Sequence, residues 1–230
     1  MQSHIKQKKY KKMNKKGFIF DLDGVIVDTA KYHFLAWKKL AKSIDVDFTN
    51  EQNEQLKGVS RVKSLEKILS WGNKSVSEDK FMELMAKKND DYLSYITEMD
   101  ETEILPDVNR VLDFLLAVKQ SISLGSASKN ARKILKKVSL IEKFDAIVDG
   151  NDVTKAKPDP EVFLIAAQEL NIKPEDCIVF EDSVAGVQAA NRANMISIGI
   201  GEKDVLHEAD YIFKDFTEMS QEFLEELINK

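Results

Sequence analysis

The chain has 230 residues, of which 43% are hydrophobic and 32% charged, with a formal net charge of −5 and a single cysteine. This length and composition predict a soluble globular protein with one substantial core and a small second unit. They exclude an intrachain disulfide, and no Cys or His spacing matches a zinc motif. No apolar stretch approaches the roughly 20 residues that span a bilayer, and the first segment lacks the apolar centre of a secretory signal, so we expect a cytoplasmic protein with no membrane partner.

Positive charge is concentrated at the start of the chain. Seven of the 34 basic residues are lysines within residues 1–16, so the remaining chain has 27 basic and 39 acidic residues and a net charge of −12. With one aromatic residue and no arginine, residues 1–16 are interpreted as a disordered, solvated arm. The alternative is an arm that binds nucleic acid or an anionic surface, but we expect no nucleic-acid partner.

Apolar runs typical of strands alternate with segments of helical periodicity. This alternation predicts an α/β fold, in which a parallel sheet carries helices on both faces. The expected strands are 17–21, 121–126, 145–148, 176–180, 195–199 and 210–213. Residues 17–28 and 99–230 are assigned to this α/β core.

Residues 29–98, between the first two expected strands, have almost wholly helical periodicity. Apolar side chains recur at helical spacing, for example at Leu65, Ile68 and Leu69, and no strand-like run interrupts them. We therefore predict a helical cap, residues 29–98, inserted after the first strand. Pro106 marks the return to the core, ahead of a helix over 107–119.

Two carboxylates follow the first expected strand. Asp21 and Asp23 are two residues apart, so on an extended chain their side chains point the same way, and Gly24 then lets the chain turn and leaves room for a ligand. This pattern predicts phosphoryl transfer through an aspartyl intermediate. The alternative is a β-hairpin in which Asp23-Gly24 only forms a tight turn.

Further polar residues follow the later strands: Ser126, Lys157 before a proline, and Glu181 with Asp182. Because ligands bind at the carboxyl ends of parallel strands, we expect one cleft to hold them together with the two aspartates of the first strand. Four crowded carboxylates repel one another unless a cation neutralises them, and an all-oxygen ligand set suits Mg²⁺.

Each of these residues also has a simpler interpretation. Glu181 and Asp182 are typical N-terminal acids for a helix over 184–192. Lys157 is also consistent with an ordinary exposed loop lysine. Residues 126–130 close a strand and open a helix, so their hydroxyls and backbone N–H groups are either an anion site or plain helix caps.

Four motifs resemble those of the haloacid dehalogenase superfamily: Asp21-Leu-Asp23-Gly, Ser126, Lys157-Pro and Glu181-Asp182, which span essentially the whole chain. The resemblance implies a Rossmann-like core and a four-helix cap. It implies that Asp21 is the nucleophile, that Lys157 offsets charge on the transferring oxygens, and that Asp23 is the general acid and base. The implied Mg²⁺ ligands are Asp21, Asp23, Glu181 and Asp182.

Further stretches resemble the sugar-phosphate mutases of that superfamily, namely Tyr32-His33-Phe34 with Trp37, 53–61, 88–90, 126–130 and 181–186. They imply an isomerase that interconverts β-glucose 1-phosphate and glucose 6-phosphate, with glucose 1,6-bisphosphate as intermediate and activating phosphoryl donor. They also imply that Thr29 is a hinge and that His33 and Lys88 help place Asp23 when the cap closes. The implied substrate-binding residues are Trp37, Leu56, Gly58, Val59, Ser60, Arg61, Lys88, Ser126, Ala127, Ser128, Lys129 and Asn130.

Alternatives remain for two residues and for the function. Arg61 also suits a surface ion pair, and His33 also suits packing beside Trp37 on the first cap helix. A sugar-phosphate phosphatase of the same superfamily would share the core chemistry but admit water to the aspartyl phosphate. A non-catalytic binding protein would have lost Asp21 or Asp23, and both are present. We expect a small sugar phosphate as partner and a monomeric chain.

Overall fold

A parallel six-stranded sheet in the order β3-β2-β1-β4-β5-β6 forms the centre of the computed structural model, which describes residues 14–230. The strands are β1 (Gly17–Phe20), β2 (Ser121–Gly125), β3 (Ala146–Val148), β4 (Cys177–Glu181), β5 (Ile196–Ile200) and β6 (Tyr211–Phe213). The helices are α1 (Ala30–Ser43), α2 (Asn50–Glu54), α3 (Arg61–Trp71), α4 (Glu78–Ile96), α5 (Val108–Ala117), α6 (Ala131–Lys137), α7 (Glu161–Glu169), α8 (Val184–Arg192) and α9 (Gln221–Asn229). All six expected strands are confirmed, each within one residue of its predicted ends.

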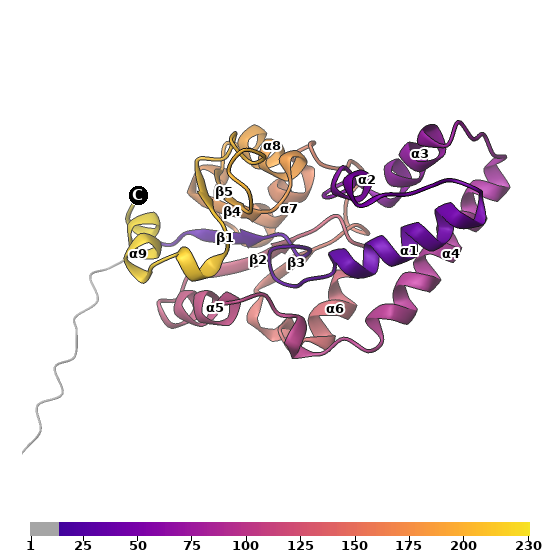
Figure 1. Cartoon of the computed structure of the whole chain (residues 1–230). Helices are drawn as coiled ribbons and strands as arrows, with labels where there is room; N and C mark the ends of the chain where they lie inside the picture. Colours follow the sequence, from indigo (N-terminus) through magenta and orange to yellow (C-terminus); the bar gives the residue numbers. More distant parts are fainter. Residues whose placement is uncertain (1–13) are drawn as a thin grey trace, which may run out of the picture.

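The side chains of β1 alternate between the two faces of the sheet, as the strand period requires. Phe18 and Phe20 belong to the apolar cluster that includes residues of α5, α6 and α9, whereas Ile19 packs with residues of α7 and α8. Figure 1 shows α7 and α8 on one side of the sheet and α5 and α6 on the other. The Phe20 ring stacks on Phe180 of β4 with their centroids 4.5 Å apart. Both faces are therefore covered, and only the ends of the strands are open to ligands.

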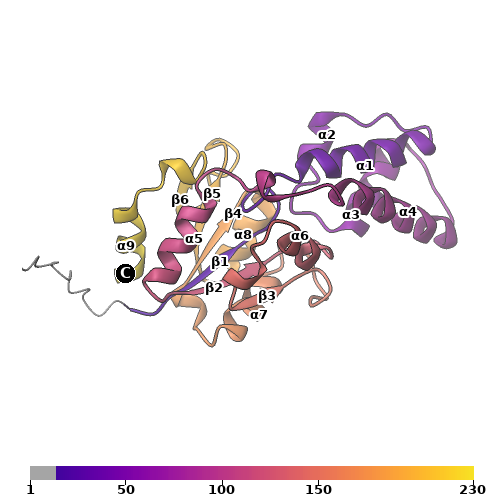
Figure 2. The ribbon, with the colours of Figure 1, turned by 90° about the horizontal axis from the view of Figure 1, so that it is seen from below.

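Helices α1 to α4 form the cap, to one side of the core (Figure 2). Its own apolar core contains Trp37, Leu40, Leu65, Ile68 and Leu84, which the helical periodicity brings to the inner faces. Side-chain caps set two helix starts: the Ser60 hydroxyl accepts a hydrogen bond from the N–H of Lys63, and Ser77 does the same for Lys80. Helices α1 to α4 thus enclose a small apolar core of their own, whereas Tyr92 and Ile96 of α4 belong to the apolar cluster around β1.

Two of the simpler sequence interpretations are wrong. β1 pairs in parallel with β2 and β4, so Asp23-Gly24 is not the turn of a hairpin. The N-cap of α8 is Ser183, whose hydroxyl accepts from the N–H of Gly186, so neither Glu181 nor Asp182 caps this helix. Both acids are consequently available to the carboxyl edge of the sheet.

The lysine-rich arm expected over residues 1–16 lies mostly outside the described residues. Lys16, at its end, belongs instead to the core: it is buried, its N–H donates to Gln120 Oε1 at 2.7 Å, and its Nζ pairs with Asp176 at 2.6 Å. The physical reason is position, because Lys16 directly precedes β1, and the N–H of Ser121 in β2 bonds to its carbonyl. The part of the chain that the structure describes thus includes the last lysine expected in the arm.

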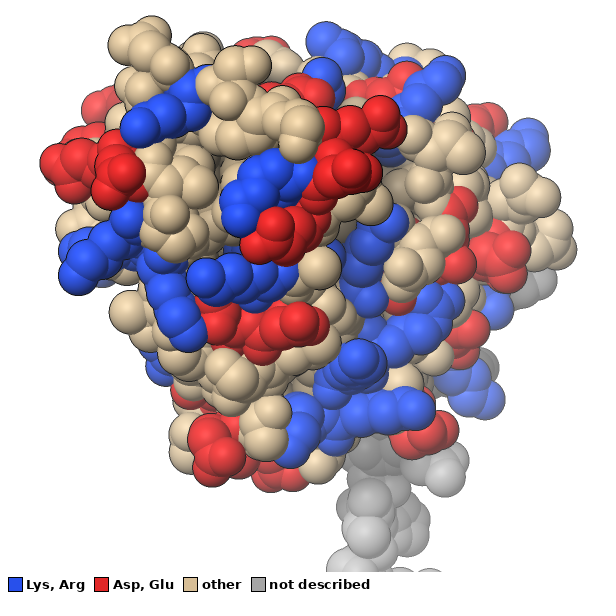
Figure 3. All heavy atoms as spheres, turned by 90° about the vertical axis from the view of Figure 1, so that its right-hand side faces the viewer, with Lys and Arg blue, Asp and Glu red and all other residues tan. Residues whose placement is uncertain are grey.

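The surface at the cap end carries charges of both signs, interspersed with one another (Figure 3). Pairs such as Lys63–Glu66 and Lys80–Glu83, each 2.8–2.9 Å apart, place opposite charges side by side on the cap helices. Within residues 14–230, no helix combines the length and the apolar character needed to cross a bilayer.

Candidate active site

The carboxyl edge of the sheet and the cap enclose a cavity of about 490 Å³. Its wall contains most of the residues expected at the site: Asp21, Asp23, His33, Trp37, Leu56, Gly58, Val59, Ser60, Arg61, Lys88, Ser126, Ala127, Ser128, Lys129, Asn130 and Asp182. Thr29, Lys157 and Glu181 lie behind this wall, bonded to residues that line it or lie beside it. The topology therefore brings together residues that are up to 161 positions apart in the chain, Asp21 and Asp182.

Lys157 is buried between two carboxylates. Its ammonium group donates to Asp21 Oδ1 at 2.7 Å, to the carbonyl of Gly125 at 3.1 Å, and to Glu181 Oε1. Burial lowers the pKa of Lys157, but Asp21 and Glu181 outweigh burial and raise it, so the side chain is a fixed positive charge. The alternative of an exposed loop lysine is wrong. All three ammonium protons are engaged, which aims the charge at Asp21.

Glu181 supports this arrangement from behind. Its Oε2 accepts hydrogen bonds from the N–H of Ser183 at 2.9 Å and from the Ser183 hydroxyl at 2.8 Å, while its Oε1 accepts from Lys157. The side chain is fully buried. Because both oxygens are bonded, Glu181 is held rigidly and fixes the position of the lysine.

Asp23 is oriented by the start of the cap. Its N–H donates to Asp21 Oδ2 at 3.1 Å, and its Oδ1 accepts a hydrogen bond from the hydroxyl of Thr29, which is fully buried at the N-cap of α1. Burial raises the pKa of Asp23, although the bond from Thr29 and the charge of Lys88 oppose this. The raised pKa favours the protonated form of this carboxyl group more than in an exposed aspartate, as a general acid requires.

His33 and Lys88 form a coupled pair on the cap, with Lys88 Nζ 3.0 Å from His33 Nδ1. Burial and then the positive charges of Lys88 and Arg61 lower the pKa of His33 well below its usual value, so the ring is neutral and Nδ1 accepts from the ammonium. The proton then lies on Nε2, which is 3.9 Å from Asp23 Oδ1 and has no hydrogen-bond partner within the described residues. His33 therefore presents an unused donor toward Asp23.

The Lys88 ammonium lies against two aromatic rings, 4.8 Å from the centroid of Trp37 and 4.5 Å from that of Tyr92. Burial, with repulsion from Arg61, lowers the pKa of Lys88 to about 7. The ring faces favour the charged form and so oppose this effect. The cap wall consequently holds two neighbouring cationic groups that have poor solvation.

The core wall carries the opposite charge. Asp182 lines the cavity beside Gly24, where a Cβ atom would lie only 2.2 Å from Asp182 Oδ2, and Gly24 has a φ of +77°. Burial raises the pKa of Asp182 well above its usual value, and repulsion from Glu181 and Asp21 adds to the effect. Burial likewise raises the pKa of Asp21 to about 7, with Lys157 opposing. Crowded, buried carboxylates at this edge disfavour their own ionised forms.

Residues 126–130 connect β2 to α6 and form one side of the cavity. The loop is closed on itself, because the N–H of Ser128 donates to the Ser126 hydroxyl at 3.1 Å and the N–H of Asn130 donates to the Ser128 hydroxyl at 3.3 Å. The Asn130 amide reaches across to Asn89 of the cap at 3.1 Å. The interpretation of this loop as a plain helix N-cap holds only in part. Asn130 is the N-cap residue of helix α6, but its side chain makes no capping hydrogen bond.

Arg61 is the first residue of α3 and lines the same cavity. No ion pair involves it among residues 14–230, so the interpretation as a surface ion pair is wrong for the part of the chain that the structure describes. Burial lowers the pKa of Arg61, which means that its guanidinium is poorly solvated. An anion in the cavity would relieve this cost.

Several residues of the cavity wall were not identified from the sequence as functional: Asn53, Lys57, Ser64, Met85, Tyr92, Gly150, Val153, Thr154, Lys155 and Ala156. Tyr92 had a usable signal, because it lies four residues after Lys88 and therefore on the same face of α4. Residues 150–156 had none, since no local pattern shows that the chain after β3 reaches the site.

The chain belongs to the haloacid dehalogenase superfamily. A family model described as a hydrolase, haloacid dehalogenase-like hydrolase, matches residues 15–194, which include β1, the cap and β4 with the acids that follow it.

Within this superfamily the chain is similar to characterised and solved proteins. It is 44% identical over 214 residues to a β-phosphoglucomutase of Bacillus subtilis, covering 92% of this chain and 94% of that one. It superimposes on the crystal structure of a β-phosphoglucomutase from Clostridium difficile with a TM-score of 0.90 and 41% identity, covering 94% of this chain and 97% of that one. A phosphorylated carbohydrates phosphatase of Thermotoga maritima is 29% identical over 77% of this chain and 81% of its own length.

Proposed function

We propose that this protein is a β-phosphoglucomutase, an isomerase that interconverts β-D-glucose 1-phosphate and D-glucose 6-phosphate through an aspartyl phosphate and β-glucose 1,6-bisphosphate. The observation that carries the proposal is the composition of one cavity. It contains a carboxylate paired with a buried lysine, as a phosphoryl acceptor needs, and also a second cationic group, Arg61, without an ion pair among the described residues. The 44% identity to the Bacillus mutase supports the same function.

In the first half-reaction Asp21 attacks the phosphorus of the bisphosphate, and the bond from phosphorus to the sugar oxygen breaks. Asp23, whose pKa burial raises, gives its proton to the leaving sugar oxygen. In the second half-reaction, with a β-glucose 1-phosphate molecule bound, Asp23 takes the proton of its C6 hydroxyl. That oxygen attacks the phosphorus on Asp21, the bond from phosphorus to the Asp21 oxygen breaks, and the bisphosphate forms again. Lys157 stabilises the negative charge on the transferring oxygens throughout, because it already donates to Asp21.

Mg²⁺ fits the carboxyl edge by the chemistry of its donors. Burial and mutual repulsion raise the pKa of Asp21, Asp23 and Asp182, so a cation that favoured the ionised forms would be bound well. Among residues 14–230, no three acidic, His or Cys side chains form a ready metal-binding cluster, and Mg²⁺ usually takes one or two carboxylates with water and phosphate oxygens. We propose Asp21, Asp182 and the Asp23 carbonyl as its main ligands, beside Glu181; when bound, it would neutralise charge on the phosphoryl group.

Removal of one carboxylate tests the Mg²⁺ proposal. Asp182→Asn should raise the melting temperature of the metal-free protein, because a buried carboxylate with a raised pKa destabilises the fold when ionised. The same variant should lose most of the stabilisation by Mg²⁺, which for a saturated wild-type site is about 3 kcal/mol at 100 times the dissociation constant. Melting curves with and without Mg²⁺ measure both effects, with Asp204→Asn, an exposed acid, as control. Equal Mg²⁺ responses in wild type and Asp182→Asn would contradict the ligand assignment.

A mutase must bind the phosphate that is not reacting, which requires a second anion site. We propose that Arg61, with Gly58, Val59 and Ser60 of the cap and Ser128, Lys129 and Asn130 of the core loop, forms it. A planar guanidinium suits two phosphate oxygens at once. Since the proposed residues all come from one chain, a monomer is sufficient.

Removal of the Arg61 guanidinium should distinguish the site of the non-reacting phosphate from the site at Asp21. Arg61→Ala is expected to weaken binding of glucose 1,6-bisphosphate by about 10- to 100-fold, the usual range for a charged hydrogen bond. Phosphorylation of Asp21 by a small donor such as acetyl phosphate should change less than twofold. Lys67→Ala, on the exposed side of the same helix, is the matched control. Equal losses with both donors would indicate general damage to the cap.

The direct test of the function is a coupled assay with β-glucose 1-phosphate, Mg²⁺ and a trace of glucose 1,6-bisphosphate. We expect glucose 6-phosphate to form much faster than inorganic phosphate. The phosphatase relative of Thermotoga maritima suggests the second candidate, a sugar-phosphate phosphatase. Steady phosphate release from sugar phosphates without isomerisation would favour the phosphatase. If neither isomerisation nor phosphate release occurred, a non-catalytic binding protein would be favoured.

A further inference from the structure

The loop after β3, residues 149–152, is attached to the proposed phosphate loop 126–130 by several hydrogen bonds. The Asn151 side-chain amide donates to the carbonyl of Lys129 at 3.1 Å, and the N–H of Gly150 donates to the carbonyl of Ser128 at 3.3 Å. A Cβ atom at position 150 would lie 2.4 Å from the carbonyl oxygen of Ala127, so glycine permits this close approach. The two loops therefore act as one unit at the edge of the cavity.

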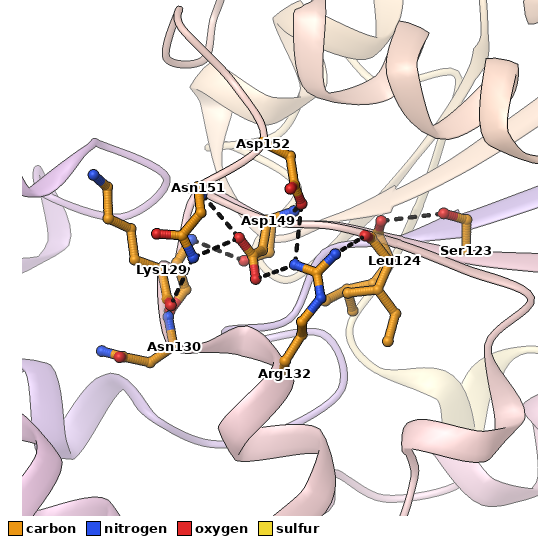
Figure 4. A network of polar contacts seen from close by, with 11 residues as sticks. Ser123, Leu124, Lys129, Asn130, Arg132, Asp149, Asn151 and Asp152 are labelled. Atoms are coloured by element: carbon orange, nitrogen blue, oxygen red, sulfur yellow. Dashed lines mark hydrogen bonds and ion pairs between the residues drawn. The ribbon is translucent and has the colours of Figure 1, made fainter.

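Asn151 is itself held by a buried acid. Asp149 Oδ1 accepts from both the N–H and the side-chain amide of Asn151, each at 2.8 Å, as Figure 4 shows. The Asp149 side chain is only 1% exposed. One bond holds the main chain of Asn151 and the other holds its side-chain amide, which also donates to the carbonyl of Lys129.

Arg132 at the start of α6 clamps this acid. Its guanidinium donates to Asp149 Oδ2 and to Asp152 Oδ2 at 3.0 Å (Figure 4), and also to the carbonyl of Ile147 at 2.6 Å. Asp152 also accepts from the N–H of Asp149 at 2.9 Å. The fork of the guanidinium thus joins α6, the end of β3 and the loop that follows it.

We propose that Asn151 is a positioning residue for the second phosphate site, and that Arg132, Asp149 and Asp152 hold it in place. This inference rests on the proposed function, because it concerns the site that binds the non-reacting phosphate. Loop 126–130 lies between strand β2 and helix α6, which has only seven residues. Hydrogen bonds from the neighbouring loop 149–152 therefore help to fix its conformation. Because the main chain of Lys129 is fixed, Ser128, Lys129 and Asn130 already have their binding conformation before the phosphate arrives. Less conformational entropy is then lost on binding.

Two variants of the full-length protein test the inference. Asn151→Ala removes the bond to Lys129, and Arg132→Met removes the clamp. Both should raise the KM for glucose 1,6-bisphosphate, by about three- to tenfold for Asn151→Ala as expected for one hydrogen bond, and kcat should change less than twofold. Phosphorylation of Asp21 by acetyl phosphate with Mg²⁺ should also change less than twofold, because Asn151 does not contact that end of the site.

The controls distinguish positioning from simple charge. Lys133→Met loses the same charge as Arg132→Met from the adjacent, exposed position and should leave KM unchanged, and Arg132→Lys should not restore KM, because an ammonium lacks the fork. An unchanged KM in Asn151→Ala, an equal loss of Asp21 phosphorylation, or equal effects at positions 132 and 133 would overturn the inference. If Arg132→Met does not fold, Asn151→Ala decides alone. Wild-type protein that shows no bisphosphate-dependent isomerisation would refute the proposed function instead.

Discussion

Replacing Asp21 by Asn is expected to abolish turnover, by a factor on the order of 10⁴ or more, because the nucleophile that carries the phosphoryl group is lost. Asn retains the shape of Asp, and its one amide oxygen can still accept from Lys157 Nζ, which also keeps its bond to Glu181, while only the N–H of Asp23 loses its acceptor. The fold should therefore be preserved. Mass spectrometry after incubation with acetyl phosphate and Mg²⁺ should show a phosphoryl group on the wild-type protein and none on the variant.

The control for this variant lies in the same connection between β1 and the cap. Asp28→Asn removes one negative charge from an exposed position that does not line the cavity, so its rate should stay within about twofold of wild type. If Asp21→Asn kept a tenth of the normal rate, or if its phosphoryl label persisted, the covalent mechanism would be refuted. A similar loss in Asp28→Asn would point to a general charge effect.

The strands and the cap could be predicted because each depends on a local pattern. Short apolar runs mark β1 to β6, and helical periodicity marks the cap. The motif acids were harder, since Glu181 and Asp182 fit helix capping as well as a ligand site. The structure places Glu181 against Lys157, 24 residues earlier in the chain. No local pattern contains that contact.

Residues 149–152 illustrate the same limit more strongly. Asp149, Asn151 and Asp152 have the composition of an ordinary turn, and Arg132 has that of an exposed helix position. Their relation depends on β2 and β3 lying side by side, with Gly125 opposite Val148, so that the loops after the two strands meet. Sequence motifs predict which residues react, whereas the residues that hold them in place depend on the register of the sheet.

Replacing Lys157 by Met should cost both stability and activity. Lys157 is 1% exposed and is bonded to two carboxylates, so its removal leaves Asp21 and Glu181 without a cation. Removal of one partner of a buried ion pair lowers the free energy of unfolding by about 3–5 kcal/mol. For a chain of this size we expect the melting temperature to fall by about 6–20 °C. Turnover should fall at least about a hundredfold, because the charge on the transferring oxygens loses its fixed partner.

A second substitution separates these two effects. Glu181→Gln in the Lys157→Met background removes one of the two unpaired buried charges, so the double variant should recover part of the melting temperature but none of the turnover. Lys173→Met, at a position 78% exposed, should change neither property and controls for the loss of a lysine. If the double variant were less stable than Lys157→Met, the instability would come from lost packing against Phe163, which lies 4.7 Å from the ammonium, and the unpaired charge would not be its cause.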